Sequence, residues 1–185
     1  MFSLDPASET DQKYVVTHGN ARVSVITERL FRAEYSPDRI FTDKPTQKVW
    51  YRNFDSPEFK SEIAGGQIII TTPKCRIAVS CANGSFLYAQ INGRKIKDLK
   101  KGNLKGTYRT LDGTIGAIPL GDGVVSKNGT ALFDDSKSLL LNSDGTVRGR
   151  QEHLKDVYLF AYGLDYRAAV KDFLRLTGGV PLIPR

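Results

Sequence analysis

A run of short strand-like segments between residues 59 and 98 constrains the fold of this chain most strongly. Apolar and β-branched stretches follow one another and are separated by glycine, proline or asparagine pairs. They are Phe59–Ala64, Gln67–Thr72, Cys75–Ser80 and Phe86–Ile91. The Asn83-Gly84 and Asn92-Gly93 pairs suit type I′ turns, whose twist matches antiparallel strands. Short strands with turn signals at this spacing predict an antiparallel sandwich or barrel.

Further strands are expected on both sides of this region. Apolar and polar residues alternate in Ala21–Val25 and Leu30–Tyr35, as in strands with one buried face, and a short link predicts a hairpin between them. Thr130–Phe133, Ser138–Leu141 and Asp156–Ala161 are also strand-like. The fold class expected is mainly β, an antiparallel sandwich with one C-terminal helix.

That helix is predicted from Asp165 to Thr177, because the pattern changes there to helical spacing. Its apolar face would consist of Ala169, Val170, Phe173, Leu174 and Thr177. Asp165 is a suitable N-cap, and Gly178 stands where helices commonly end. The tail that follows contains Pro181 and Pro184 and is not helical. We interpret this apolar tail as the point where another domain begins.

Asn103–Ser136 is the least periodic part of the chain and contains six glycines and four aspartates. Long irregular segments in compact domains are usually functional or disordered. This one carries many apolar residues, among them Leu104, Tyr108, Leu120 and Val125. We therefore expect an ordered loop against which something else packs.

Charge and composition exclude few classes of protein. The 185 residues carry a net charge of +7, and six basic residues gather between Arg94 and Lys105. Such a run could contact nucleic acid, although a solvated turn is the simpler interpretation. The N-terminus lacks a secretory pattern, and no apolar run approaches the about 20 residues that span a bilayer. We expect a cytoplasmic protein without membrane or nucleic-acid partners, whose Cys75 and Cys81 are unpaired thiols.

The residues alone supply no catalytic constellation. His18 and His153 have no spacing that suggests a metal site, and no cofactor motif is present. Asp134 and Asp135 would point to opposite sides of a strand and suit a turn better than paired acid–base chemistry. Trp50 is interpreted as a core or edge-packing residue rather than a ligand platform.

Several motifs in residues 103–185 resemble glycoside hydrolase family 31. They are Asn103–Thr107, Arg109–Asp112, Ile118–Gly123, Asp134–Ser136, Asp156–Ala169 and Leu176–Arg185. The similar part is the N-terminal β-sandwich of α-glucosidase- and α-xylosidase-type enzymes, which belongs to the galactose-mutarotase-like superfold. In that family, a segment like Pro181–Arg185 leads into a catalytic (β/α)₈ barrel.

The resemblance implies a non-catalytic domain of a retaining α-glycosidase. The family's nucleophile lies in a Trp-x-Asp-Met-Asn-Glu-like motif on the barrel, and Met1 is the only methionine here. No catalytic residue, metal ligand or cofactor is therefore expected. Residues 1–155 would form the sandwich and 156–185 would lead towards the barrel in cis. Asp122 is the expected acceptor for a sugar hydroxyl and Arg109 a second polar contact to the parent enzyme's α-linked substrate. An independent carbohydrate-binding module is the alternative.

Overall fold

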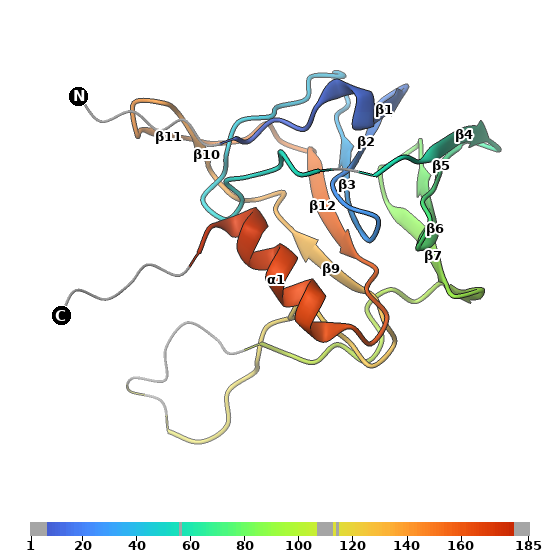
Figure 1. The fold of residues 1–185 in the computed structure, drawn as a ribbon. Helices are drawn as coiled ribbons and strands as arrows, with labels where there is room; N and C mark the ends of the chain where they lie inside the picture. Colours follow the sequence, from blue (N-terminus) through green and yellow to red (C-terminus); the bar gives the residue numbers. More distant parts are fainter. Residues whose placement is uncertain (1–6, 56, 107–112, 114, 180–185) are drawn as a thin grey trace.

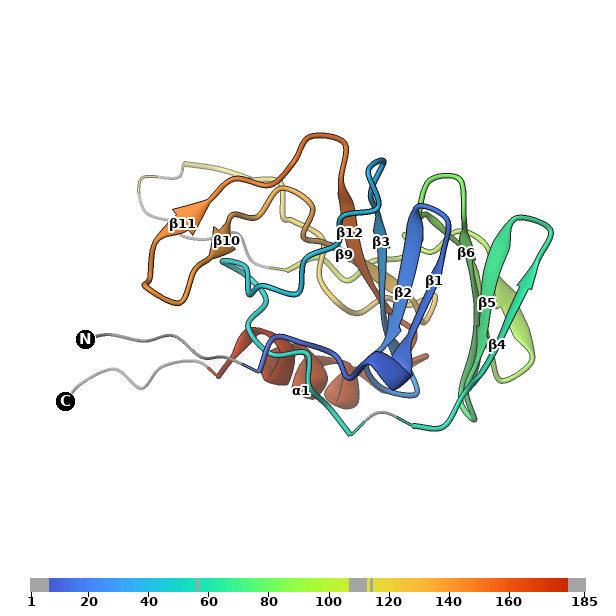
Figure 2. The same ribbon diagram turned by 90° about the horizontal axis from the view of Figure 1, so that it is seen from above.

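The computed structural model describes residues 7–55, 57–106, 113 and 115–179. Two five-stranded antiparallel sheets face each other within this part of the chain, and a single α-helix covers the far side of one of them (Figures 1 and 2). The expectation of a mainly β sandwich with one C-terminal helix is confirmed. No helix in this part of the chain has the length and apolar character needed to cross a membrane.

The first sheet combines the two ends of the chain. Its strand order is β1-β2-β3-β12-β9. The strands are β1 (Val15–His18), β2 (Ala21–Val25), β3 (Leu30–Tyr35), β12 (Lys155–Phe160) and β9 (Ala131–Asp134). The predicted hairpin is the β2–β3 pair, which places Val23 opposite Ala33. β12 lies between β3 and β9, so the late strand joins the N-terminal hairpin to the edge strand.

The second sheet is a simple meander in sequence order. It consists of β4 (Lys60–Ala64), β5 (Gln67–Thr71), β6 (Cys75–Ser80), β7 (Phe86–Ile91) and β8 (Arg94–Ile96). Both residues of the Asn92-Gly93 turn have positive φ, as a type I′ turn requires. Asn83 does not, because β6 and β7 are joined by a five-residue connection with only Gly84 at positive φ, so that type I′ prediction is wrong.

Two smaller elements complete the described fold. β10 (Leu140–Leu141) and β11 (Val147–Arg148) form a short hairpin closed by the Asn142–Gly145 turn. A 3₁₀ turn, Gln12–Tyr14, precedes β1. Helix α1 (Tyr166–Thr177) begins at Asp165, whose carboxylate accepts a hydrogen bond from Ala168 N at 3.2 Å, and ends at Gly178 with φ of 87°. Both predicted ends of the helix are confirmed.

The apolar core lies in two layers, one on each face of the first sheet. Between the sheets, residues such as Val23, Phe31, Ile77 and Leu159 are fully buried. On the other face, Leu30 and Phe160 pack against Ala169 and Leu176 of α1. Burying a large aliphatic or aromatic side chain contributes about 1.5–3 kcal/mol, so both layers are needed to hold the sheet and helix together.

The strands β2 and β3 are buried on both faces, contrary to the expectation of one solvated face. Arg22, Arg32 and Glu34 have 0–6% of their surface exposed because the segment 36–55 covers them. They belong to the buried ion cluster, four arginines and four carboxylates joined by hydrogen bonds or ion pairs, together with Tyr158. Its charged members are Arg22, Arg32, Arg52, Arg150, Glu34, Asp43, Asp135 and Asp156.

Candidate functional site

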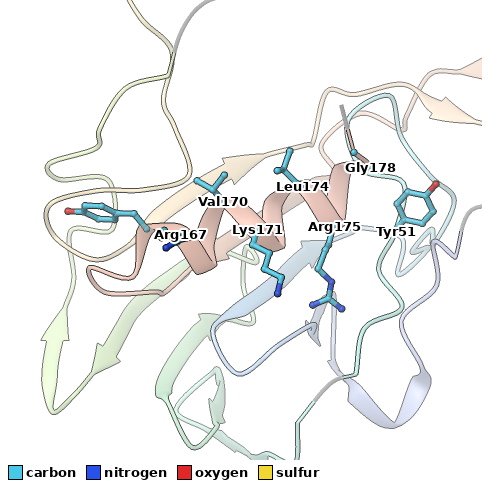
Figure 3. Close-up of a pocket in the computed structure, with 9 residues that line it drawn as sticks. Tyr51, Arg167, Val170, Lys171, Leu174, Arg175 and Gly178 are labelled. Atoms are coloured by element: carbon cyan, nitrogen blue, oxygen red, sulfur yellow. The ribbon is translucent and has the colours of Figure 1, made fainter. Parts of the chain in front are cut away.

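A shallow apolar groove runs along the outer side of α1 and is the first candidate site (Figure 3). Its volume is about 780 Å³. The residues that line it come from α1, from the two glycines that follow the helix and from one tyrosine of a distant segment. They are Tyr51, Tyr166, Arg167, Val170, Lys171, Leu174, Arg175, Gly178 and Gly179. We call this surface the α1 groove.

The floor of the α1 groove is made by residues one helical turn apart. Val170 and Leu174 lie on the same side of α1, with 43% and 39% of their surfaces exposed. Tyr51, which is 38% exposed, borders the groove at the C-terminal end of the helix (Figure 3). The backbone N–H groups of Trp50 and Tyr51 both donate to the carbonyl of Leu176, which fixes this tyrosine to the helix end.

The exposed position of Val170 and Leu174 corrects the expected apolar face. Sequence periodicity grouped them with Ala169 and Phe173, which do pack towards the sheet. Leu176, absent from that prediction, is fully buried. The helix therefore has apolar residues around more than one side, and one part of them remains on the surface.

A row of basic side chains accompanies the apolar floor. Arg167, Lys171 and Arg175 are spaced four residues apart and line the same groove. Arg175 pairs with Asp172 at 3.2 Å, and its guanidinium lies 4.2 Å from the centre of the Phe54 ring. The groove thus offers an apolar floor and a positively charged border, which suits a protein surface bearing carboxylates.

A second depression, the sheet-mouth cleft, lies where the two sheets part beside β9. Its volume is about 520 Å³. Residues from β7, β9, β12 and the connecting segments line it, including Asp122. They are Lys48, Gly84, Ser85, Phe86, Lys100, Asp122, Leu132, Phe133, Asp134, Ser136, Lys155 and Val157.

The glycine-rich segment reaches this cleft through a paired base. Leu104 N donates to Val125 O, and Gly106 N donates to Gly121 O, both at 2.9 Å. Asn103 exchanges two amide hydrogen bonds with the backbone of Gly123 at 2.8 Å each. A side chain at Gly123 would lie 2.9 Å from the Leu104 carbonyl oxygen, so this close pairing requires glycine. The base of the segment is thus paired, and the expectation of an ordered loop against which something else packs stays a prediction.

The apolar residues of the segment divide into two groups. Val124 and Val125 pack against the core layer beneath α1. Ile115 and Leu120 are exposed, at 101% and 42% of their surfaces. Within the described residues, therefore, the base of the segment and β9 at its end pack against the core, whereas Ile115 and Leu120 do not.

Asp122 and Arg109 were the two site residues expected from sequence. Asp122 lines the sheet-mouth cleft and is ion-paired through Oδ1 with Lys105, and 45% of its side-chain surface is exposed. Arg109 lies outside the described residues. The role of both as sugar contacts stays a prediction.

Asp122 and Asp134 both line the cleft, and two carboxyl groups across a cleft are the arrangement that glycoside hydrolysis requires. Asp134 is exposed, and its Oδ1 accepts a hydrogen bond from Ser136 N at 2.9 Å. Neither carboxyl group has the apolar enclosure that glycosidases use to keep a proton donor protonated. Within the described residues, no group of three or more histidine, cysteine or acidic side chains is arranged to bind a metal ion.

The buried ion cluster is the most charged interior feature, and sequence reasoning missed it. Asp135, interpreted as a turn residue, is fully buried, whereas Asp134 is exposed, so the two do point to opposite sides. Burial and the neighbouring Asp156 charge raise the pKa of Asp135. Burial alone would raise the pKa of Asp156, but Arg32 and Arg150 hold it well below its usual value. The alternating arginine and glutamate of β2 and β3 were the available signal.

Three polar atoms of this region are buried without a hydrogen-bond partner among the described residues. They are Arg52 Nη2, Asp135 Oδ1 and Ser138 Oγ. Arg52 is otherwise fully engaged, since Nε donates to the Tyr158 hydroxyl at 2.6 Å and Nη1 to three backbone carbonyls. The Asp43 side chain is 22% exposed and the other charged side chains of the cluster are nearly or fully buried, so the cluster belongs to the interior of the fold rather than to a binding surface.

Comparison with known proteins gives partial structural likeness only. No family model and no curated protein matches this chain. A glycoside hydrolase family 31 dextranase from Flavobacterium johnsoniae, complexed with glucose, is 14% identical with a TM-score of 0.44, over 89% of this chain and 26% of that one. An uncharacterized protein from Listeria monocytogenes, in complex with glucose, magnesium and calcium, is 13% identical with a TM-score of 0.47, over 99% of this chain and 23% of that one.

A family 31 α-xylosidase from Xanthomonas citri is 14% identical with a TM-score of 0.29, over 69% of this chain and 16% of that one. The chain thus spans about a quarter or less of each of these proteins. At these identities and TM-scores the matches assign neither a family nor an activity to it.

Proposed function

We propose that this chain is the N-terminal β-sandwich of a retaining α-glycosidase of the family 31 type, with the galactose-mutarotase-like superfold. The sandwich extends beyond the expected boundary at residue 155, because β12 lies within the first sheet and ends at Phe160. The residues after β12 lead towards a (β/α)₈ barrel in cis that carries out hydrolysis. The resemblance of the motifs in residues 103–185 supports this assignment. The chain itself supports the barrel and contributes no catalytic group.

The observation that carries the proposal is the α1 groove. Val170, Leu174 and Tyr51 expose apolar surface along one continuous depression, at the side of α1 that does not face the sheet. Contiguous apolar patches on a protein surface often mark interaction sites, whereas apolar residues that are exposed singly do not. The groove is shallow and bordered by cations, which favours a broad protein surface over an enclosed small ligand.

The glycine-rich segment supplies the second part of the proposal. Its paired base projects Asp122 and the neighbouring residues away from the core, where they contribute to the rim of the substrate site. Asp122, whose Oδ1 contacts Lys105, accepts a hydroxyl of an α-linked oligosaccharide in this proposal, and Arg109 provides a second polar contact.

Reading the gene beyond the codon for Arg185 tests the proposal directly. We expect the frame to continue into a barrel that contains a Trp-x-Asp-Met-Asn-Glu-like motif. A stop codon, or a continuation without that motif, contradicts the assignment to a retaining glycosidase of this type.

Hydrolysis assays provide an independent test on the purified chain. The enclosed carboxylates Glu34, Asp135 and Asp156 line neither the α1 groove nor the sheet-mouth cleft. We therefore expect no release of nitrophenol from a nitrophenyl α-glucoside above the blank. Measured hydrolysis that persists through repeated purification contradicts the role of a non-catalytic domain.

The docking role is tested in the full-length protein. Val170→Asp together with Leu174→Asp places charge on the groove floor, and we expect faster proteolysis between the domains and lower thermal stability of the whole enzyme. Ile63→Asp together with Val147→Asp is the matched control, because these side chains are 48% and 52% exposed on β4 and β11 and do not line the groove. Equal effects of the two changes contradict docking through α1.

The alternative is an independent carbohydrate-binding module, and the exposure of Tyr51 is the observation in its favour. Trp50 beside it is half-buried, so only one face of a platform is available there. Titration of maltose or isomaltose against tryptophan fluorescence separates the two functions. Saturable quenching that Tyr51→Ala abolishes favours the module, and no response favours the docking domain.

A further inference from the structure

The sheet-mouth cleft carries more positive charge than its carboxylates balance. Lys48, Lys100 and Lys155 all line it, although they come from three separate parts of the chain. Within the described residues, none of the three ammonium groups is paired with a carboxylate. The fold therefore gathers three cations around one depression without using them in ion pairs of its own.

Two of these lysines are oriented by neutral oxygens. Lys155 Nζ donates to the Ser85 hydroxyl at 3.2 Å, and Lys48 Nζ donates to the backbone carbonyl of Asp134 at 3.2 Å. Each ammonium group has three N–H donors, so both retain donors for a ligand. Lys48 also lies 5.5 Å from the centre of the Phe133 ring, which limits the region its ammonium group occupies.

The carboxylates of the cleft do not cancel this charge. Asp122 is already paired with Lys105, which is not among the lining residues, and only Asp134 remains to offset three lysines. The local excess of positive charge favours an anionic ligand, since charge-assisted hydrogen bonds to carboxylate or phosphate are stronger than neutral ones.

The floor of the cleft is apolar and sets the size of the ligand. Leu132, Val157 and Phe86 are its aliphatic and aromatic lining residues that contact or flank the core, and all three are partly buried. Its volume of about 520 Å³ falls in the range of about 300–1,000 Å³ typical of small-molecule sites. A ring or short chain can lie on this floor while an anionic group faces the lysines.

We propose that the sheet-mouth cleft binds a small organic anion, whose carboxylate or phosphate is held by Lys48, Lys100 and Lys155 and whose carbon skeleton lies on Leu132 and Val157. This site is distinct from the α1 groove and does not depend on the proposed attachment to a barrel. A sugar acid and a sugar phosphate present the same chemistry to it.

Calorimetric titration of the purified chain with four probes tests the proposal. The probes are glucuronate, glucose 6-phosphate, glucose and inorganic phosphate, each at low ionic strength. We expect at least one of the two charged sugars to bind about tenfold more tightly than glucose and than inorganic phosphate. The binding weakens as salt screens the lysines.

The relative affinities of the probes decide each part of the proposal. Preference for glucuronate identifies a carboxylate site and preference for glucose 6-phosphate a phosphate site. Glucose binding as tightly as both overturns the anionic requirement. If inorganic phosphate binds as tightly as the charged sugars, the role of the apolar floor is overturned. If neither charged sugar binds, the proposed site is overturned.

Matched variants assign the binding to the cleft. Lys48→Gln with Lys155→Gln is expected to weaken the charged probe about tenfold or more, and Lys100→Gln alone, at an exposed position, several-fold. Lys60→Gln with Lys74→Gln removes the same charge at two exposed positions outside both the cleft and the α1 groove and is expected to leave binding unchanged. Equal losses in the two double variants overturn the assignment, and circular dichroism checks that each variant is folded. The reading frame beyond Arg185 tests the proposed function separately, so failure of one does not imply failure of the other.

Discussion

Arg32 and Asp156 form a two-point ion pair between neighbouring strands in the interior of the protein. Arg32 Nε lies 2.8 Å from Asp156 Oδ1, and Nη2 lies 2.7 Å from Oδ2, with both side chains fully buried. Arg150 contacts the same carboxylate at 2.8 Å, and Arg32 also lies 2.9 Å from Glu34. This pair joins β3 to β12, so it ties the N-terminal hairpin to the late strand at the centre of the sheet.

Replacing Arg32 with methionine tests the energetic weight of this pair. Arg32→Met keeps much of the volume but leaves Glu34 and Asp156 buried with less compensating charge. Breaking a buried pair in this way costs about 3–5 kcal/mol, because an uncompensated charge remains in the interior. Urea unfolding followed by fluorescence measures the loss in the free energy of unfolding.

Arg76→Met is the control for this change. Arg76 lies 3.7 Å from Glu62 on the surface, with 44% and 62% of the two side chains exposed. Exposed pairs contribute about 0–1 kcal/mol, so a small effect is expected. Comparable losses for the two variants contradict a special role of the buried cluster.

The acid stability of the protein should depend on Asp156. Its folded-state pKa is held below the unfolded value by Arg32 and Arg150, despite burial. The stability it contributes is therefore fully present above the unfolded pKa of about 3.9 and is lost as pH falls below that value. Burial raises the pKa of Glu34 above its unfolded value, so ionised Glu34 destabilises the fold at neutral pH, and this penalty is relieved as pH falls through the raised pKa.

Asp156→Asn separates these two contributions. The variant is less stable at neutral pH, because Arg32 and Arg150 lose their shared carboxylate, but its free energy of unfolding should fall less steeply between about pH 4 and pH 2. Urea titrations at several pH values give both slopes. Equal slopes for the variant and the original protein contradict the low pKa of Asp156.

Local sequence pattern predicted most of the strands because their turns are chemically distinct. Glycine and asparagine pairs mark the ends of β4–β8, and the predicted ranges differ from the observed ones by at most a residue for most strands. The ends of α1 followed from Asp165 and Gly178 for the same reason. These elements depend on neighbouring residues, which a sequence displays directly.

The burial of β2 and β3 on both faces could not be predicted in the same way. Alternation in Ala21–Val25 indicates that one face of the strand is polar. The pattern does not say whether that face contacts solvent or buried residues of opposite charge. Asp43, which contacts Arg22, lies 21 residues away along the chain, and Asp156, which contacts Arg32, lies 124 residues away. The error in the apolar face of α1 has the same origin, since periodicity does not say which apolar side the sheet covers.

The candidate sites, too, could be predicted from the sequence only in part. The sequence indicated Asp122 through its motif but not its pairing with Lys105 or its position in the sheet-mouth cleft. Lys48, Lys100 and Lys155 are separated by long stretches of chain, and only the sheet topology brings them together. Of these residues, Lys100 belonged to the basic run noted in the sequence.

Among the turn glycines of the second sheet, Gly84 is the one whose replacement should reduce the stability of the protein most. It has φ of +66°, and a Cβ there would lie 2.7 Å from Tyr35 Cβ and 3.2 Å from the Glu34 backbone. Gly66 has a similar φ of +72° with nothing within 4 Å. Gly66→Ala should cost about 1–2 kcal/mol from backbone conformation alone.

Gly84→Ala adds a steric clash between the two sheets to that cost. Forcing extra atoms into a well-packed contact costs about 1–3 kcal/mol more. Thermal unfolding of both variants under one buffer measures the difference. A Gly84→Ala protein as stable as Gly66→Ala contradicts the close approach of the β6–β7 connection to β3.

The two thiols should differ strongly in reactivity. Cys75 is 5% exposed, its Sγ donates to the Glu28 carbonyl at 3.2 Å, and burial raises its pKa to about 11. At pH 8 the thiolate, which is the reactive form, is then about one part in a thousand at Cys75. Burial also raises the pKa of Cys81, but that side chain is partly exposed and accessible.

Alkylation of the folded protein with iodoacetamide at pH 8 should therefore modify Cys81 at least about tenfold faster than Cys75. Peptide mapping by mass spectrometry at a series of times gives both rates. In guanidinium chloride, where both thiols are exposed, the rates should become similar, which controls for intrinsic differences. Similar rates in the folded protein contradict the burial of Cys75 between β6 and the Glu28 turn, because local opening would then expose it as readily as the surface thiol.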